Sequence, residues 1–171
     1  MRWGGLWRHR DFRRLWIGDT ISQFGTTISR LALPLLAVLV LHASPFQVGL
    51  LTAFETLAFL LIGLPAGAWV DRMRRRRVLI VNDLVRTVAI GSVPVAAAVG
   101  VLGMGQLYVV AFVTGVSTVF FDVAYQSYLP ELIGRDDLVV GNAALQASQS
   151  VAVVAGPSVG GALVQVLGAP T

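Results

Sequence analysis

Long apolar runs separated by short polar turns dominate the pattern along this chain. Five runs are near or above the ~20 residues that an α-helix needs to cross a bilayer. We expect transmembrane helices at about residues 15–41, 48–70, 78–102, 107–125 and 139–167. The runs are continuous rather than alternating, which is typical of helices and not of membrane β-strands. The pattern therefore predicts an all-α polytopic membrane protein.

Composition agrees with this class and narrows the chemistry. The chain is 56% hydrophobic and only 13% charged, whereas a soluble domain carries about a quarter charged residues. It has no cysteine, which excludes disulfides and thiol catalysis. Its two histidines are far apart and outside the spans, and no phosphate-binding glycine loop is present. We therefore expect no metal site, no cofactor and no enzymatic activity.

Arginine is distributed unevenly between the two sides of the membrane. The formal net charge of +4 could suggest nucleic-acid binding, but arginines flank the spans, where the positive-inside rule places them. They lie in residues 1–14, in residues 72–77 and at Arg135, whereas the loops at 42–47 and 103–106 have neither arginine nor acid. We expect residues 1–14 to be a cytoplasmic basic segment and residues 15–171 to form the membrane bundle.

Ionisable residues inside the spans are the first candidates for function, because a charge in hydrocarbon costs several kcal/mol. Asp19, Gln23 and Arg30 share one face of the first span, and Glu55 lies in the second at a depth similar to Arg30. These four residues are cavity candidates for substrate or ion binding. Arg30 and Glu55 could equally form a neutralising pair with no transport role.

A second group lies nearer the cytoplasmic side. Asp83 and Arg86 in the third span and Asp122 in the fourth could share a layer with Asp19. Substrate contact is one interpretation of this group. A helix-end or snorkelling role, in which each long side chain reaches toward the membrane surface, is the other.

The basic turn between the second and third spans carries an acid among its arginines. Its key positions are Gly67, Asp71, Arg72, Arg75 and Arg76. An acid favours a helix N-terminus, and arginine can bind a carboxylate through two parallel hydrogen bonds. The turn is either a conformational latch or a plain positive-inside anchor.

Small residues in the fifth span form a separate motif. Gly156 and Gly160 are four apart, with Pro157 and Gly161 beside them. Such spacing lets helix backbones approach closely, and ordinary helix packing explains it as well as any special function.

These motifs together resemble the major facilitator superfamily. The Gly67-x3-Asp71-Arg72-x-x-Arg75-Arg76 turn looks like its signature between helices two and three. The Gly156-Pro157-x2-Gly160-Gly161 stretch looks like the fifth-helix motif of its drug:proton antiporters. Residues 12–16, 63–67, 120–126 and 129–132 are similar to bacterial exporters of the enterobactin and macrolide type.

The resemblance implies twelve helices in two six-helix bundles, with a small-molecule substrate bound between them. Asp19, Gln23 and Arg30 would line that cavity. Asp71 would clamp a helix of the second half, and the arginines would tie the turn to an acid on the fourth helix, for which Asp122 is the candidate. The coupling ion would be a proton or another ion, and the location a bacterial cytoplasmic membrane, multi-pass, with the N-terminus cytoplasmic.

Two functions remain open at this point. In the first, the chain is the N-terminal portion of an ion-coupled exporter and forms five helices of an incomplete six-helix bundle. Its partner would be a C-terminal half or a second copy. Alternatively, it is a short non-transporting membrane protein that acts by helix–helix binding or oligomerisation through the Gly156/Gly160 face.

Overall fold

The computed structural model describes residues 9–134 and 137–168, with side chains up to residue 162. Within those residues the chain forms five helices and no strand. They are α2 (Arg10–Leu39), α3 (Pro45–Val70), α4 (Arg75–Val99), α5 (Met104–Ile133) and α6 (Leu138–Gly168). Each is long and apolar enough to cross a membrane. The expected all-α polytopic class is confirmed.

The helix bounds differ from the expected spans mainly at one end of the bundle. Helix α2 begins at Arg10 and α5 continues to Ile133, beyond the expected limits of residues 15 and 125. Hydropathy reports only the apolar stretch, whereas helical hydrogen bonding continues wherever backbone and packing allow. Phe12, within this extension, is fully buried among α5 and α6 side chains that include Leu129 and Val140.

Local sequence explains where several helices begin and end. Ser44 and Gln47 form a capping box at the start of α3, with Pro45 in the first turn, so two otherwise unpaired backbone N–H groups are satisfied. Gly100 follows α4 with a φ of 76°, a left-handed conformation that glycine adopts without steric cost. These signals separate α3 and α4 from their neighbours by short turns.

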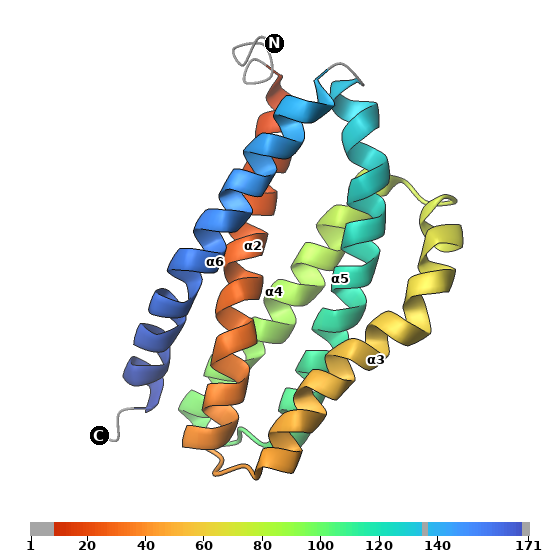
Figure 1. Cartoon of the computed structure of the whole chain (residues 1–171). Coiled ribbons are helices and arrows are strands. Elements are labelled where there is room, and N and C mark those ends of the chain that lie inside the picture. The colour runs from red at the N-terminus through yellow and green to blue at the C-terminus, as the bar shows by residue number, and fades with distance from the viewer. Residues whose placement is uncertain (1–8, 135–136, 169–171) are drawn as a thin grey trace.

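Each of the five described helices contains one internal proline. The five are Pro34, Pro65, Pro94, Pro130 and Pro157. Proline removes a backbone donor and clashes with the preceding turn, so it bends the helix. Figure 1 shows α3 changing direction toward its end, and Pro65 lies five residues before the last residue of that helix, Val70.

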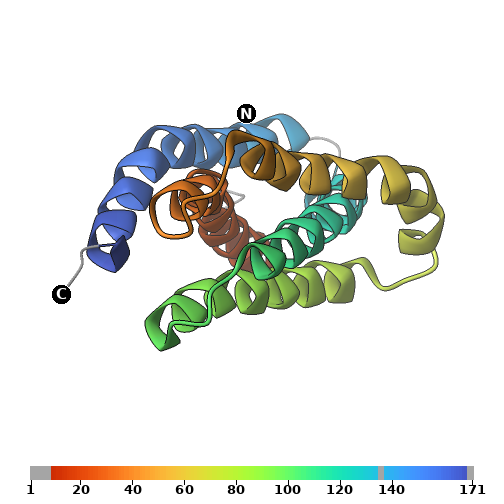
Figure 2. The ribbon, with the colours of Figure 1, turned by 90° about the horizontal axis from the view of Figure 1, so that it is seen from below.

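The helices pack in two groups. Helix α6 lies along α2, while α5 packs against both α3 and α4. Figures 1 and 2 show α2 and α6 side by side and α5 between α3 and α4. The start of α2, the α3–α4 turn and the end of α5 lie at one end of the bundle, and the α2–α3 and α4–α5 turns lie at the other.

Apolar side chains gather at the two ends of the bundle and leave the middle polar. Leu36, Leu51 and Leu107 belong to one cluster near the α2–α3 and α4–α5 turns. At the opposite end, Phe12 and Val70 belong to two further clusters. Between the ends, the buried layer contains hydroxyl and charged side chains, and the candidate site lies there.

Candidate transport site

Arg86 is the centre of the polar layer. It lies on α4 with only 7% of its surface exposed. Its Nη1 donates to Ser22 Oγ at 2.8 Å and to Thr26 Oγ1 at 3.0 Å, and its Nη2 donates to Thr118 Oγ1 at 3.3 Å. Its guanidinium also lies over the Phe121 ring, 5.5 Å from the centroid. Arg86 therefore points into the bundle, and the snorkelling interpretation of this residue is wrong.

The hydroxyl partners of Arg86 are oriented to accept. Ser22 Oγ donates its own proton to Asp83 Oδ1 at 2.8 Å. Thr26 and Thr118 donate theirs to backbone carbonyls one turn earlier, at Ser22 and Thr114. Each oxygen thus offers a lone pair to the guanidinium. Asp83 is linked to Arg86 through Ser22 rather than by direct contact.

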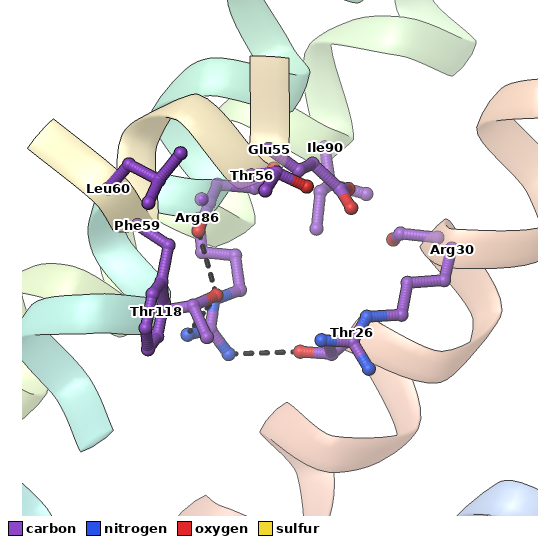
Figure 3. Close-up of a pocket in the computed structure, with 12 residues that line it drawn as sticks. Thr26, Arg30, Glu55, Thr56, Phe59, Leu60, Arg86, Ile90 and Thr118 are labelled. Atoms are coloured by element: carbon purple, nitrogen blue, oxygen red, sulfur yellow. Dashed lines mark hydrogen bonds between the residues drawn. The ribbon is translucent and has the colours of Figure 1, made fainter. Parts of the chain in front are cut away.

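Arg30 and Glu55 line one cavity, as Figure 3 shows. This central cavity of about 290 Å³ lies between α2, α3, α4 and α5. Glu55 and Arg30 interact electrostatically across it, yet no ion pair within 4.0 Å joins them among the described residues. Its wall is completed by Arg86 and mainly by hydroxyl and apolar groups, among them Thr26, Ser29, Thr56, Phe59, Ile90, Thr114 and Thr118.

A second, larger cavity is lined by two acidic residues, Asp19 and Asp122. It measures about 510 Å³ and lies between α2, α5 and α6. Asp19, Gln23 and Asp122 line it, together with Tyr125 and four polar or small residues of α6: Asn142, Ala143, Gln146 and Gln149. Asp19 is only 5% exposed, and Gln23 lies one helical turn away on the same face of α2. We call this space the acidic cavity.

A small space joins the two cavities. This connecting cavity of about 130 Å³ is lined by Gln23, Arg30, Arg86 and Asp122, among others. It shares Arg30 and Arg86 with the central cavity and Gln23 and Asp122 with the acidic cavity. A polar path therefore follows α2 through the middle of the bundle.

Asp71 is the acidic residue of the α3–α4 turn, and its side chain is exposed. Asp71 ends α3, where its backbone N–H donates to Gly67 O at 3.1 Å. The Asp71 side chain is exposed and has no hydrogen bond or ion pair to another described residue. Arg72 is exposed in the same way, and Arg76 lines a small space beside Asp83.

One arginine of the turn does bind an acid on α5, but not the expected one. Arg75 Nη1 lies 2.7 Å from Glu131 Oε2. Asp122 was the expected partner; it lies about 13 Å earlier along α5 at 1.5 Å per residue, where it lines the cavities. No described contact joins Asp122 to the turn in this structure, because the turn meets the end of α5 and Asp122 lies deeper; a link between the two stays a prediction.

The glycine motif of α6 is used inside the chain. A Cβ at Gly156 would lie 2.6 Å from Thr27 Cγ2, and one at Gly160 would lie 3.5 Å from Ile28 O. Both glycines therefore allow α6 to approach α2. Pro157 and Gly161 lie outside this contact: Pro157 is exposed, and no atom lies within 4 Å of a Cβ at Gly161. The face proposed for oligomerisation is covered by α2.

Sequence reasoning missed several residues of this site. Ser22 and Thr118 bind Arg86, and Glu131 binds Arg75. Ser22 and Thr26 are four residues apart on one helix face, and this spacing could have indicated that Ser22 belongs to the site. Glu131 belongs to the exporter-like stretch 129–132, but nothing local indicates what it or Thr118 binds, because their partners come from another helix.

Five membrane-length helices around a charged interior, with cavities between them, define a multi-pass membrane protein built like a transporter. The chain belongs to the transmembrane secretion effector family of the major facilitator superfamily, whose pattern matches residues 3–171. The members of this family are transporters and not enzymes. In the described part of the chain, no group of three or more acids and histidines could hold a metal ion.

Curated relatives of this chain include proteins named as multidrug efflux pumps. The multidrug efflux pump Tap of Mycolicibacterium fortuitum is 31% identical over 150 residues, which are 84% of this chain and 36% of the pump. Tap of Mycobacterium tuberculosis H37Rv is 32% identical, over 88% of this chain and 37% of the pump. The uncharacterized MFS-type transporter YfiS of Bacillus subtilis is 27% identical, over 85% and 34%. The chain spans about a third of these relatives, and no solved structure matches it.

Proposed function

We propose that this chain is the N-terminal portion of an ion-coupled exporter of small molecules in a bacterial cytoplasmic membrane. One observation carries the proposal: Arg86 and its hydroxyl partners lie beside cavities between helices that are long enough to cross a membrane. Buried charge of this kind is costly and marks a substrate or ion path. The efflux activity named for the Tap relatives supports the direction of transport.

The working unit would contain more helices than these five. Exporters of this superfamily move substrate between two halves that rock about a central site. The acidic cavity has several exposed lining residues, among them Asp122, Gln146 and Gln149, which a second half would cover. A C-terminal half is the partner we propose, and Asp71 would contact it.

Two carboxylates are the candidates for ion coupling. Asp19 and Asp122 both line the acidic cavity, where each carboxylate could take up and release a proton during transport. We propose that the proton is the coupling ion. In inside-out vesicles that hold the complete transporter, substrate addition should then collapse an imposed pH gradient, and Asp19→Asn or Asp122→Asn should abolish that collapse.

The first test is the size and activity of the native product. An antibody against residues 1–14 should detect a band at about twice 18.2 kDa or larger, and that product should lower the accumulation of ethidium in an efflux-deficient host. A protonophore should restore accumulation. A sole band near 18 kDa with unchanged ethidium accumulation would overturn the exporter assignment.

Orientation is proposed from the arginines and can be measured directly. We place the start of α2 and the α3–α4 turn in the cytoplasm. Since the chain has no cysteine, single cysteines at Met73 and Ser44 report on the two ends without background. A membrane-impermeant maleimide added to whole cells should label Ser44→Cys and leave Met73→Cys unlabelled; the reverse pattern would invert the topology.

A further inference from the structure

Two arginines face the same space without a matching number of acids. Arg30 from α2 and Arg86 from α4 both line the central cavity and the connecting cavity. Each cavity contains one carboxylate against these two guanidinium groups: Glu55 in the central cavity and Asp122 in the connecting cavity. Figure 3 shows Arg30 and Arg86 reaching into the space from different helices.

Neither arginine is neutralised by contact. Among the described residues, no carboxylate oxygen lies within 4.0 Å of Arg30 or Arg86. Arg30 has no hydrogen bond to another described residue, and the buried Nε of Arg86 is also without a partner. A buried guanidinium whose hydrogen-bond partners are neutral hydroxyl groups keeps a positive charge that a bound anion can neutralise.

The other groups at this point suit an anion as well. Thr26 and Thr118 hold Arg86 by accepting from it, so the guanidinium plane is fixed before any ligand arrives. Thr56 and Ser29 line the same wall, although their hydroxyl protons already go to backbone carbonyls at Thr52 and Gly25. The positive charge, and not the hydroxyl groups, is therefore what the cavity offers a ligand.

We propose that the central cavity binds an anionic group of the transported molecule, a carboxylate, phosphate or sulfonate, between Arg30 and Arg86. Arginine presents paired donors that match such groups. The apolar part of the ligand would lie against Phe59, Leu60 and Ile90, which line the same cavity. This inference rests on the proposed transport function, because it assigns the chemical class of what is carried.

The test uses two probes of one shape and opposite charge. The full chain is placed in nanodiscs of neutral phosphatidylcholine, and binding of 1-naphthalenesulfonate and of 1-naphthylmethylammonium is measured by calorimetry against empty nanodiscs. The sulfonate should bind saturably at one site per chain, and the ammonium should bind at least about tenfold more weakly, a factor that corresponds to one charge-assisted hydrogen bond. Equal binding of both probes would overturn the proposal.

Variants assign the site. Arg30 has no hydrogen bond or ion pair to another described residue, so Arg30→Gln should fold and should weaken sulfonate binding by about tenfold. Glu55→Gln removes a repelling charge and should tighten it severalfold. Arg13→Gln, which removes an exposed arginine at one end of the bundle, is the matched control and should leave binding unchanged. If Arg30→Gln and Arg13→Gln behave alike, the site is not between these arginines.

Arg86 needs a gentler change because its guanidinium joins α4 to α2 and α5 through three hydrogen bonds. Arg86→Lys keeps the charge but loses the planar fork, and should weaken sulfonate binding while the nanodisc sample keeps its thermal unfolding midpoint within a few degrees. Unchanged affinity in this variant would remove Arg86 from the site.

Failure of this inference can be told apart from failure of the proposed function. Efflux of ethidium by the complete transporter, together with absent sulfonate binding, would overturn the anion site and leave the exporter assignment intact. Sulfonate binding that depends on Arg30, in a transporter that exports neither ethidium nor the sulfonate, would overturn transport and with it the statement that the anion is carried.

Discussion

Arg75 Nη1 at the start of α4 lies 2.7 Å from Glu131 Oε2 at the end of α5. The pair ties the α3–α4 turn to the helix that packs against both α3 and α4. Arg75 is half-buried and Glu131 is mostly exposed, so the contact can open without exposing an apolar core. A movement of the α3–α4 turn would therefore separate Arg75 from Glu131 before it exposed any apolar core.

Reversing the charges should reveal the Arg75–Glu131 link. Arg75→Glu and Glu131→Arg should each lower the thermal unfolding midpoint of the purified chain, and the double variant should recover most of the loss. Partly exposed pairs couple by about 0.2–1 kcal/mol, so the recovery should be of that order. Glu131→Arg combined with Arg72→Glu is the control, because Arg72 has no described partner, and no recovery is expected there.

Asp71 tests the latch. Its side chain is exposed and unpaired among the described residues. It caps the end of α3, in the turn that the Arg75–Glu131 pair joins to α5. Asp71→Asn in the complete transporter should abolish ethidium efflux and leave membrane insertion and thermal stability of this chain unchanged. Insertion is checked by maleimide labelling of a cysteine at Ser44. Wild-type efflux in this variant would show that the turn is only a basic anchor.

Gly156 should tolerate no larger residue opposite Thr27. An alanine Cβ there would approach Thr27 Cγ2 to 2.6 Å, and overpacking of this kind costs about 1–3 kcal/mol. Gly156→Ala should lower the thermal midpoint, and adding Thr27→Ser, which removes the clashing methyl, should restore it. Gly161→Ala has no atom within 4 Å of the new Cβ and should leave the midpoint unchanged. A Gly161→Ala loss equal to that of Gly156→Ala would contradict the α2–α6 contact.

The charge relation between Arg30 and Glu55 can be separated from direct pairing. Because no ion pair within 4.0 Å joins them, we expect the exchange variant Arg30→Glu with Glu55→Arg to insert as well as the wild type but to export poorly. The exchange preserves the cavity's net charge and moves one of its two cations from α2 to α3. Efflux and insertion are measured on the same membranes. Full efflux in the exchange variant would mean that net charge alone matters.

Much of the architecture follows from local sequence. Each apolar run is long enough to span a bilayer, and a helix satisfies its own backbone in hydrocarbon, so five helices and their order could be predicted without any tertiary contact. The motifs at Gly67–Arg76 and Gly156–Gly161 were sufficient to indicate the superfamily, because they depend on residue type at fixed spacing. Asp19 and Arg30 stood out for the same reason: a charge in an apolar run is visible in the sequence alone.

Tertiary structure decided where those side chains meet. Sequence placed Arg86 near a helix end, but the rotation of α4 turned it inward onto Ser22, Thr26 and Thr118. The same holds for Arg75, which found Glu131 instead of Asp122, and for Gly156, which met α2 instead of another chain. Hydropathy and spacing determine which residues lie in the membrane, because burial in hydrocarbon depends on each segment by itself. Partners depend on helix rotation and neighbours, which only the packing of the whole bundle sets.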